Sequence, residues 1–382
     1  MKYMFIAGEA SGDLHAAEVI RHLRHTDHEA SFMFMGGDLM AAAAGREPIV
    51  HYREMAYMGF SEVLRNLGKI RGNLSTARRQ LRLWEPDALV LVDYPSFNLK
   101  VADAAHSLGI PVFYYVSPKV WAWKEWRVRT LKKLVHKMLV IFPFEVDYYR
   151  DKHNWEVEYV GNPSVAEIDR ALSEAPGRPE FLKRNALRDR PIVALLPGSR
   201  LGEIRNNLSV MERAVMQFPQ YRGVVAAAPG VDPEFYKPFT RLPVISGQTV
   251  SLLKHSRAAL VTSGTATLEA ALCGVPQVAC YRSNGSKIAY NLMKRVLSVD
   301  YVTLPNLIAG RAVIPEMLLH MCTPEAVAAE LTPLLREGSE ARNAQLQGYR
   351  DMRRALGDGD AGKNAAQAIY TDLRNHKNSR HA

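Results

Sequence analysis

The sequence predicts an α/β protein built from two doubly wound units, each a parallel sheet covered by helices. Apolar runs without polar alternation, which are typical of fully buried parallel strands, recur along the chain and alternate with helical patterns. Several of these runs end in turns of small or charged residues, where α/β proteins bind ligands. The chain of 382 residues is also too long for one ordinary core, which favours two domains.

The first half carries six candidate strands, at residues 3–8, 30–35, 88–92, 110–116, 137–142 and 157–160. A polar stretch with two prolines and a glycine, residues 173–190, marks the region of the domain boundary. Five further strands follow at 192–196, 221–227, 242–245, 258–261 and 277–281, then a loop region over 304–316. We therefore expect domains at 1–170 and 171–345, with a terminal helix and tail at 346–382 packing back toward the first domain.

The first strand ends in Glu9-Ala10-Ser11-Gly12-Asp13, where a helix begins. Gly12 permits close approach of another group, and Ser11 or Asp13 can cap the helix. We interpret Asp13 as a cap rather than a catalytic group. Glu9 lies at the carboxyl end of the strand and faces any cleft there, and a catalytic role and a structural role are both open for it.

The buried strand at 88–92 ends in Asp93-Tyr94-Pro95-Ser96-Phe97-Asn98. A carboxylate at the carboxyl end of a parallel strand is where an α/β enzyme would keep a general base. Asp93 can equally be a turn residue or a helix cap. The residues alone leave both interpretations open.

Two turns in the second half favour binding of a phosphate or diphosphate. Pro197-Gly198-Ser199-Arg200 follows one apolar run, and Ser263-Gly264-Thr265 follows another and precedes a short helix. Backbone N–H groups and the helix dipole suit an anion there, and the Arg200 guanidinium offers a bidentate fork. Glu269, one turn into the helix, can accept hydrogen bonds from ribose hydroxyls. The alternatives are an ordinary capped helix and a surface ion pair of Arg200.

A stretch that begins at Met58 combines an apolar stripe with a strongly basic remainder. The apolar positions are Met58, Phe60, Val63, Leu64, Leu67, Ile70 and Leu74. This pattern suits a helix lying on an anionic bilayer, and packing of the stripe on the sheet is the alternative. Further along, Trp121, Trp123 and Trp126 lie among lysines and arginines, which suits either lipid headgroups or sandwiching of the rings between helices.

The formal net charge of +10 indicates an anionic partner. The sequence has no RNP or zinc-finger pattern, which disfavours nucleic acid and leaves a membrane or a phosphorylated substrate. Three cysteines without metal spacing indicate a reducing compartment, and we expect neither a signal peptide nor a bilayer-spanning segment, because the sequence shows no apolar run of the pattern or length that either requires. Asp358-Gly359-Asp360 matches the DxD pattern of metal sites but lies in a Gly-rich turn, so we expect it to cap a helix.

Six motifs together resemble the lipid-A-disaccharide synthase family. They are GEASGD at 8–13, VDYPSFN at 92–98, YVSPKVWAWKEWRV at 115–128, LPGSR at 196–200, TSGTATLE at 262–269 and DYVTLPNLIAGR at 300–311. Single motifs of this kind are weak, whereas six in the expected order and at the expected separations are specific.

The resemblance implies a GT-B glycosyltransferase, with two Rossmann-like doubly wound domains facing each other across a cleft. Members of the family transfer 2,3-diacylglucosamine from UDP to 2,3-diacylglucosamine 1-phosphate (lipid X), with inversion and release of UDP. The β-1,6-linked product belongs to lipid A biosynthesis in Gram-negative cells. The resemblance implies no metal or other cofactor, and a cytoplasmic protein bound peripherally to the inner face of the inner membrane. A homo-oligomer remains open.

By the same resemblance, Asp93 is the general base, and Glu9 positions the acceptor or assists the base. Arg200 and the turn at 263–265 stabilise charge on the departing UDP. The full nucleotide set is Ser199, Arg200, Ser263, Gly264, Thr265, Glu269, Asn306 and Glu316. The acceptor-facing or lipid-facing set is Ser11, Gly12, Met58, Phe60, Val63, Leu64, Leu67 and Ile70.

One position departs from the family. Leu319-His320-Met321 follows Glu316 where the family often has a glutamine, so no role is carried over to that side chain. Two rival functions remain: a UDP-N-acetylglucosamine 2-epimerase, which shares the GT-B fold but binds no lipid acceptor, and a non-catalytic UDP-sugar-binding or membrane scaffold protein.

Overall fold

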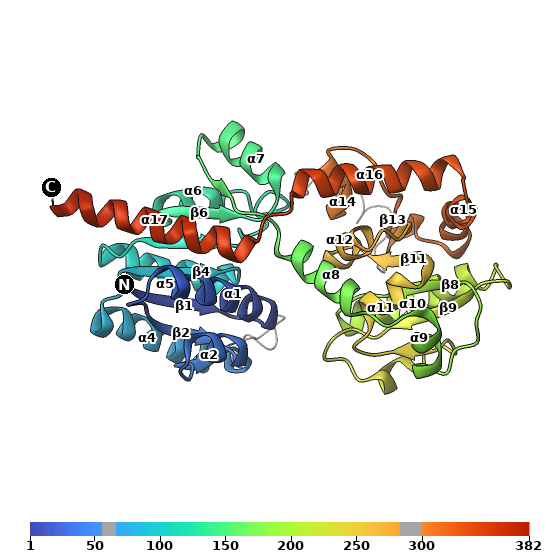
Figure 1. Cartoon of the computed structure of the whole chain (residues 1–382), viewed down its shortest axis with the longest axis horizontal. Coiled ribbons are helices and arrows are strands. Elements are labelled where there is room, and N and C mark those ends of the chain that lie inside the picture. Colours follow the sequence, from blue (N-terminus) through green and yellow to red (C-terminus); the bar gives the residue numbers. More distant parts are fainter. Residues whose placement is uncertain (56–65, 283–299, 382) are drawn as a thin grey trace. The chain divides into compact units, whose positions relative to one another are not determined.

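The computed structural model describes residues 1–55, 66–282 and 300–381. It divides into two compact units: unit 1 comprises Met1–Pro163 and Asp358–Ala382, and unit 2 comprises Ser164–Gly357 (Figure 1). Residues 170 and 345 fall inside helices α8 (Pro163–Glu174) and α16 (Glu340–Leu356). The stretch at 173–190, predicted as the region of the domain boundary, lies within unit 2 and contains helix α9 (Arg178–Arg184), whose Phe181 is buried in the unit 2 core.

Unit 1 is built on a seven-stranded parallel sheet, here sheet A, with strand order β3-β2-β1-β4-β5-β6-β7. The strands are β1 (Lys2–Ala7), β2 (Ser31–Gly36), β3 (Val50–His51), β4 (Ala88–Val92), β5 (Val112–Tyr115), β6 (Lys137–Val140) and β7 (Glu158–Tyr159). The chain moves outward from β1 in one direction and from β4 in the other. The boundary between β1 and β4 is therefore the topological switch point, where α/β sheets bind ligands.

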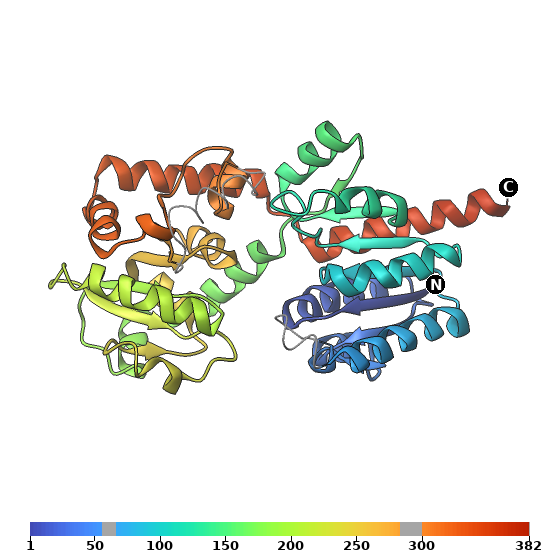
Figure 2. The same ribbon diagram turned by 180° about the vertical axis from the view of Figure 1, so that it is seen from behind.

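Helices cover both faces of sheet A (Figure 1 and Figure 2). One face packs against α4 (Leu67–Trp84), α5 (Pro95–Ser107) and α6 (Arg127–Leu134), which lie side by side in that order. Met4 and Ile6 of β1 are buried among the side chains of these helices. The alternate residues of β1 point to the other face, which carries α1 (Ala10–Thr26), α2 (Asp38–Ala44) and α17 (Ala361–His381). Helix α7 (Pro143–His153) follows β6.

Unit 2 repeats the scheme with a six-stranded parallel sheet, here sheet B, in the order β10-β9-β8-β11-β12-β13. The strands are β8 (Ile192–Leu196), β9 (Arg222–Ala226), β10 (Val244–Ile245), β11 (Ser256–Thr262), β12 (Gln277–Tyr281) and β13 (Glu316–Leu318). Its switch point lies between β8 and β11.

Two apolar clusters cover the faces of sheet B. Val193 and Leu195 of β8 point toward α10 (Leu201–Val215) and α15 (Pro324–Leu335). The alternate residues of β8 point toward α9, α11 (Thr249–Lys254) and α12 (Thr265–Leu272). Strands buried on both faces explain why the sequence shows continuous apolar runs here rather than alternation.

The predicted α/β class and both doubly wound sheets are confirmed, and every predicted strand is present within a few residues. Strand β3 was not predicted. The region 304–316, which the sequence predicts as a loop, instead contains α14 (Leu304–Ala309) and the first residue of β13. Its Pro and Gly residues suggested a loop, but Pro305 lies in the first turn of α14 and Gly310 ends it with φ +63°. Among the described residues, no helix has the length and apolar character needed to cross a bilayer.

Candidate functional site

Asp93 and Glu9 follow the ends of two neighbouring strands at the switch point of sheet A. Strands β1 and β4 are paired so that Ala7 is opposite Val92. The residues that follow these two positions, Gly8-Glu9 and Asp93, therefore leave the same edge of the sheet as neighbours. The two carboxylates are thus placed at the position where an open α/β sheet binds its ligand.

The turn that carries Asp93 has an unusual backbone. Asp93 has φ +45° and Tyr94 has φ +48°, a left-handed conformation that costs non-glycine residues ~1–3 kcal/mol each. The carbonyl oxygen of Asp93 accepts hydrogen bonds from Nδ2 of Asn98 at 2.7 Å and from the hydroxyl of Tyr114 at 2.6 Å. These two side chains hold the strained turn in place and so fix the direction of the Asp93 side chain.

The carboxyl group of Asp93 is set up to hold a proton more firmly than an ordinary aspartate. Burial raises its pKa, and the positive charges of Lys119 and His15 together with a hydrogen bond from the backbone of Tyr94 oppose the rise. Burial also raises the pKa of Tyr114, so its hydroxyl remains a hydrogen-bond donor. A carboxylate with a raised pKa is a stronger base, which suits removal of a proton from a hydroxyl.

Tyr94 packs directly over Gly8, the residue before Glu9. A Cβ added at Gly8 would lie 2.4 Å from two ring carbons of Tyr94, which is far inside van der Waals contact. The Tyr94 hydroxyl donates to the carbonyl oxygen of Met55 at 2.6 Å, so the ring cannot move aside without losing this bond. Gly8 is therefore required where the two switch-point turns meet.

Replacing Gly8 by alanine is expected to lower turnover by about 10- to 100-fold, because displacement of Tyr94 moves the neighbouring Asp93 out of its reactive position. The steady-state rate with saturating substrates measures this. Gly72→Ala is the matched control: its added Cβ on α4 meets no atom within 4 Å, and we expect an unchanged rate. Equal rates for Gly8→Ala and wild type would contradict the packing argument.

The other residues of the GEASGD motif have different environments. Ser11 is exposed in the first turn of α1. Gly12 is buried, and a Cβ there would lie 3.3 Å from Cβ of Ala7, so this glycine lets α1 approach the sheet closely. The buried carboxylate of Asp13 accepts hydrogen bonds from the backbone N–H groups of Gly37, Leu39 and Met40 at 2.7–3.2 Å. Asp13 is therefore a cap, as predicted, but of the neighbouring helix α2 rather than of its own.

The two predicted phosphate-type turns also meet, at the switch point of sheet B. Leu196 at the end of β8 is paired with Val261 of β11. The Pro197–Arg200 and Ser263–Thr265 turns therefore leave neighbouring strands at the same edge. Each turn leads into the N-terminus of a helix, α10 and α12 respectively, where backbone N–H groups and the dipole favour negative charge.

The turn at 197–200 forms hydrogen bonds with the carboxylate of Glu203, which lies on the following helix α10. Oε2 of Glu203 accepts hydrogen bonds from the backbone N–H of Ser199 at 3.2 Å and of Arg200 at 3.4 Å, and Oε1 lies 3.7 Å from the Arg200 guanidinium. Glu203 was not among the predicted residues, although its position three residues after the N-cap Arg200 is that of a capping-box glutamate. An acidic group in this position shows that the turn accommodates an anion.

In the second turn, Gly264 has φ +146°, a conformation that only glycine adopts readily, and a Cβ there would meet no atom within 4 Å. The Ser263 hydroxyl donates to the carbonyl oxygen of Val302 at 3.2 Å, and Thr265 is exposed. Behind the turn, burial and the charge of Glu167 raise the pKa of Glu269. The turn is thus open on the side of Gly264 and tied to the 302–316 segment by Ser263.

Asn306, which is buried, and Glu316, which is half-buried, form one hydrogen-bonded network. The amide of Asn306 donates to the carbonyl oxygen of Ile314 and to Glu316, and accepts from the N–H groups of Val313 and Ile314, all at 2.7–3.0 Å. The Glu316 carboxylate also accepts from the N–H groups of Val302 and Thr303. All four hydrogen-bonding positions of the Asn306 amide are therefore used within the protein, and the pair holds the segment that Ser263 contacts.

Comparison with known proteins identifies the family of the chain. A family profile described as lipid-A-disaccharide synthetase matches residues 3–369. The chain belongs to this family. It is 40% identical over 378 residues to a lipid-A-disaccharide synthase of Myxococcus xanthus, with 96% of each chain covered. It is 37% identical over 363 residues to one of Nitrosococcus oceani, with 93% of this chain and 92% of the relative covered.

Solved structures show the same fold at low sequence identity. A UDP-GlcNAc 2-epimerase from Neisseria meningitidis, bound to UDP-GlcNAc, superposes with a TM-score of 0.63 at 14% identity, covering 98% of this chain and all of that one. A calicheamicin glycosyltransferase superposes with a TM-score of 0.58 at 16% identity, covering 97% of this chain and 98% of that one. These similarities confirm the GT-B fold class, and at this level of identity they support the fold alone.

Of the lipid-facing residues that the family resemblance implies, Met58, Phe60, Val63 and Leu64 lie outside the described residues. Leu67, the first residue of α4, is 40% exposed, and Ile70 is half-buried. The later apolar positions Leu74, Ala77 and Leu81 pack on the sheet core. Between Leu67 and Trp84 the helix carries five basic residues and no acidic one. The stripe therefore packs on the sheet in its second half and leaves its first turn exposed.

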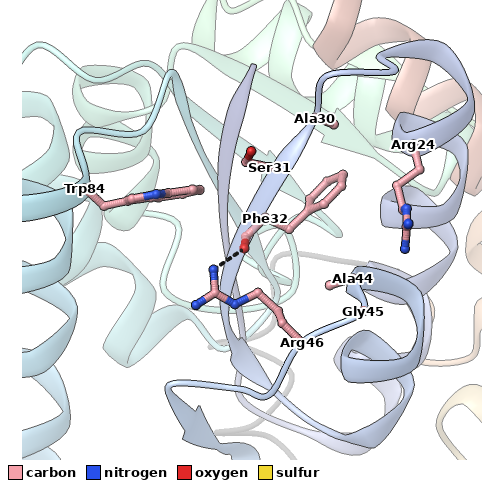
Figure 3. Close-up of a pocket in the computed structure, with 8 residues that line it drawn as sticks. All are labelled: Arg24, Ala30, Ser31, Phe32, Ala44, Gly45, Arg46 and Trp84. Atoms are coloured by element: carbon pink, nitrogen blue, oxygen red, sulfur yellow. Dashed lines mark hydrogen bonds between the residues drawn. The ribbon is translucent and has the colours of Figure 1, made fainter.

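A pocket of about 510 Å³ lies at the opposite edge of sheet A, where β2 begins and α2 and α4 end (Figure 3). Its lining is Arg24, Ala30, Ser31, Phe32, Ala44, Gly45, Arg46 and Trp84. Each of the two guanidiniums donates a hydrogen bond to a backbone carbonyl, Arg46 to Phe32 and Arg24 to Ala43, both at 2.9 Å. None of these residues belongs to the predicted site, which lies at the carboxyl edge of the strands.

The Asp358-Gly359-Asp360 turn caps a helix, as predicted: Oδ1 of Asp360 accepts a hydrogen bond from the N–H of Lys363 at 3.0 Å, in the first turn of α17. Within the described ranges, no three His, Cys, Asp or Glu side chains are grouped as metal ligands.

Proposed function

We propose that the chain transfers 2,3-diacylglucosamine from UDP-2,3-diacylglucosamine to 2,3-diacylglucosamine 1-phosphate, with Asp93 as the general base. As a member of the lipid-A-disaccharide synthetase family, the chain is a glycosyltransferase of lipid A biosynthesis. The observation that carries the assignment of the base is the Asp93 carboxyl, which is held at the switch point of sheet A with a raised pKa.

In the proposed reaction the 6-hydroxyl oxygen of the acceptor attacks the anomeric carbon of the donor from the side opposite UDP. The hydroxyl proton passes to the Asp93 carboxylate as the new carbon–oxygen bond forms. The bond between the anomeric carbon and the diphosphate oxygen breaks, and UDP leaves with the electron pair. Attack opposite to the leaving group inverts the anomeric centre and gives the β-1,6 linkage.

We assign the leaving diphosphate to the two turns at the switch point of sheet B. Ser199, Arg200, Ser263, Gly264 and Thr265 and the N-termini of α10 and α12 would stabilise its charge. Two features support this assignment: the turns adjoin, and one of them already accommodates the Glu203 carboxylate. Glu269 would accept hydrogen bonds from the ribose hydroxyls.

We assign Asn306 and Glu316 to holding the 302–316 segment rather than to direct contact with the nucleotide. Their full set of internal hydrogen bonds supports this role. In unit 1, Glu9 and the exposed Ser11 would position the acceptor next to Asp93, whereas Gly12 would act through the close packing of α1 on the sheet.

Both substrates carry acyl chains, so we infer that the protein works at a membrane surface and propose the cytoplasmic face of the inner membrane as its location. The net charge of +10 and the acid-free, basic helix α4 support attraction to an anionic bilayer.

The deciding experiment is transfer from UDP-2,3-diacylglucosamine to lipid X in detergent micelles, with EDTA present. We expect disaccharide 1-phosphate and UDP in equal amounts, at a rate that EDTA does not change. A folded, UDP-binding protein that forms no disaccharide would overturn the proposal. Conversion of UDP-N-acetylglucosamine to its 2-epimer by the same preparation would then identify the rival function.

A further inference from the structure

The loop between β5 and α6 presents two large aromatic rings to solvent. Trp123 is 51% exposed and Trp126 is 68% exposed, although tryptophan is usually mostly buried. Trp126 is the N-cap residue of α6. Exposed rings of this size mark an interaction surface when they occur together.

The loop that carries these rings is hydrogen-bonded to helix α7. Trp121, in the first turn of the loop, is buried and donates from Nε1 to Oε1 of Glu145 at 3.1 Å. The hydroxyls of Ser117 and Tyr149 are hydrogen-bonded at 2.7 Å. Both partners lie on α7, so the loop is anchored at two points and the exposure of Trp123 and Trp126 does not result from a loose segment.

Cations accompany the exposed rings. The ammonium of Lys124 lies 3.9 Å from the ring centroid of Trp123, and the guanidinium of Arg127 lies 5.5 Å from that of Trp126. Arg129 is exposed on the following turn. The single carboxylate from 117 to 129, Glu125, lies 3.2 Å from Nε2 of His153 on α7. The exposed part of the loop is therefore aromatic and positively charged. We call Trp123, Lys124, Trp126 and Arg127 the aromatic rim.

The topology places the aromatic rim at the same edge of sheet A as Asp93. The loop leaves the carboxyl end of β5, and β5 is paired with β4, which ends next to Asp93. Helices that connect parallel strands start at this edge and run back to the other one. The first residues of α4, α5 and α6 therefore lie along it, with Asp93 and the start of α5 between the exposed Leu67 and the aromatic rim.

We propose that the aromatic rim binds the headgroup region of an anionic lipid bilayer and turns the Asp93 edge of unit 1 toward the membrane. The inference rests on the proposed function, in that it names the surface through which the protein reaches its acylated acceptor. Indole rings with an apolar body and a polar N–H partition to the headgroup level, and neighbouring cations bind anionic lipids there. An acidic protein partner would match the positive charge of the aromatic rim. It would not explain why two exposed indole rings lie at the same edge of sheet A as Asp93.

The test is flotation of the full chain with vesicles of phosphatidylcholine and phosphatidylglycerol at 7:3, without either substrate. We expect the double variant Trp123→Ala with Trp126→Ala to bind at least about tenfold more weakly than wild type, because each ring removes a large apolar area from water. Lys124→Gln with Arg127→Gln should lose about tenfold on these vesicles and little on phosphatidylcholine alone.

Leu83→Ala is the matched control. Leu83 is 73% exposed on α4 but close to its last residue, at the amino edge of the sheet, so its loss should leave vesicle binding unchanged. A far-UV circular dichroism spectrum and a urea unfolding midpoint equal to those of wild type show that each of these unit 1 variants is folded. Unchanged vesicle binding of the double tryptophan variant would overturn the proposal. If the same variant raised only the KM for lipid X in micelles, the rings would belong to the acceptor site instead. Transfer activity of wild type in micelles is independent of these results, so failure of the aromatic rim leaves the proposed reaction intact.

Discussion

Asp93→Asn is expected to lower the rate of disaccharide formation by about 100- to 10,000-fold at neutral pH, which is the usual contribution of a positioned general base. Asparagine has the same shape, and the groups that hold the turn, Asn98 and Tyr114, bond the backbone carbonyl of residue 93 rather than its side chain. The substitution should therefore remove the base without moving the turn. Single-turnover formation of disaccharide measures the chemical step directly.

Asp103→Asn is the control for this substitution, because Asp103 is an exposed aspartate on α5, the helix that follows the Asp93 turn. It should retain the full rate. UDP binding should be unchanged in both variants, since the nucleotide groups belong to unit 2. A rate for Asp93→Asn within a few-fold of wild type would remove Asp93 from the mechanism.

The pH dependence of wild type follows from the same residue. Only the carboxylate form of Asp93 can accept the proton, and burial raises its pKa. The value of kcat/KM should therefore be full above this raised pKa and fall as the pH is lowered through it. The acid limb should lie at a higher pH than that of an ordinary aspartate, and a titration of kcat/KM in one buffer series would show it.

Asn306→Asp is expected to destabilise unit 2 by about 3 kcal/mol or more at pH 7.5 and to weaken UDP binding. The substitution removes the donor for Ile314 O and places a second carboxylate where the amide nitrogen now lies 2.9 Å from Oε1 of Glu316. Loss of buried hydrogen bonds and repulsion between like charges both act against the folded state. Urea unfolding and UDP calorimetry measure the two effects.

The effect of Asn306→Asp should depend on pH in a defined direction. The introduced carboxyl would have a raised pKa beside Glu316, so the folded variant binds more protons than the unfolded chain. Its stability should then recover as the pH falls and decline as the pH rises. Asn343→Asp on α16, at an exposed position, is the control and should show neither effect. Normal UDP affinity with lowered stability would mean that the network does not position the turn at Ser263.

The sequence predicted which polar residues of the candidate site follow strand ends. Asp93, Arg200 and Ser263 were identified because each follows a continuous apolar run, and parallel strands bring such ends to one edge. The support of the site was not predictable in this way. Asn98 and Tyr114 act through the backbone oxygen of Asp93, and Tyr94, at the N-cap of α5, contacts Gly8, which lies 86 residues earlier in the chain. No local pattern signals contacts of that kind.

Asn306 shows a second limit of prediction from the sequence. Its place in the family motif suggested contact with the nucleotide, whereas the structure uses every hydrogen-bonding position of its amide within the 302–316 segment. A polar residue in a motif can either contact the ligand or complete a buried hydrogen-bond network. The two cannot be separated without knowing which backbone groups lie nearby, and the helix α14 that decides this was itself not predicted.

Helix α17 has a consequence for how the chain is made. It packs on α1 through buried alanines and through Ile369 and Leu373, and it belongs to unit 1 although all of unit 2 precedes it in the chain. During synthesis, unit 2 therefore emerges as one continuous stretch and can fold before unit 1 is complete. Until α17 is made, the outer face of α1 stays uncovered. The ribosome needs about 10 to 40 s to add the almost 200 residues of unit 2 that come before α17. Over that interval the nascent protein exposes the apolar surface that a chaperone would bind.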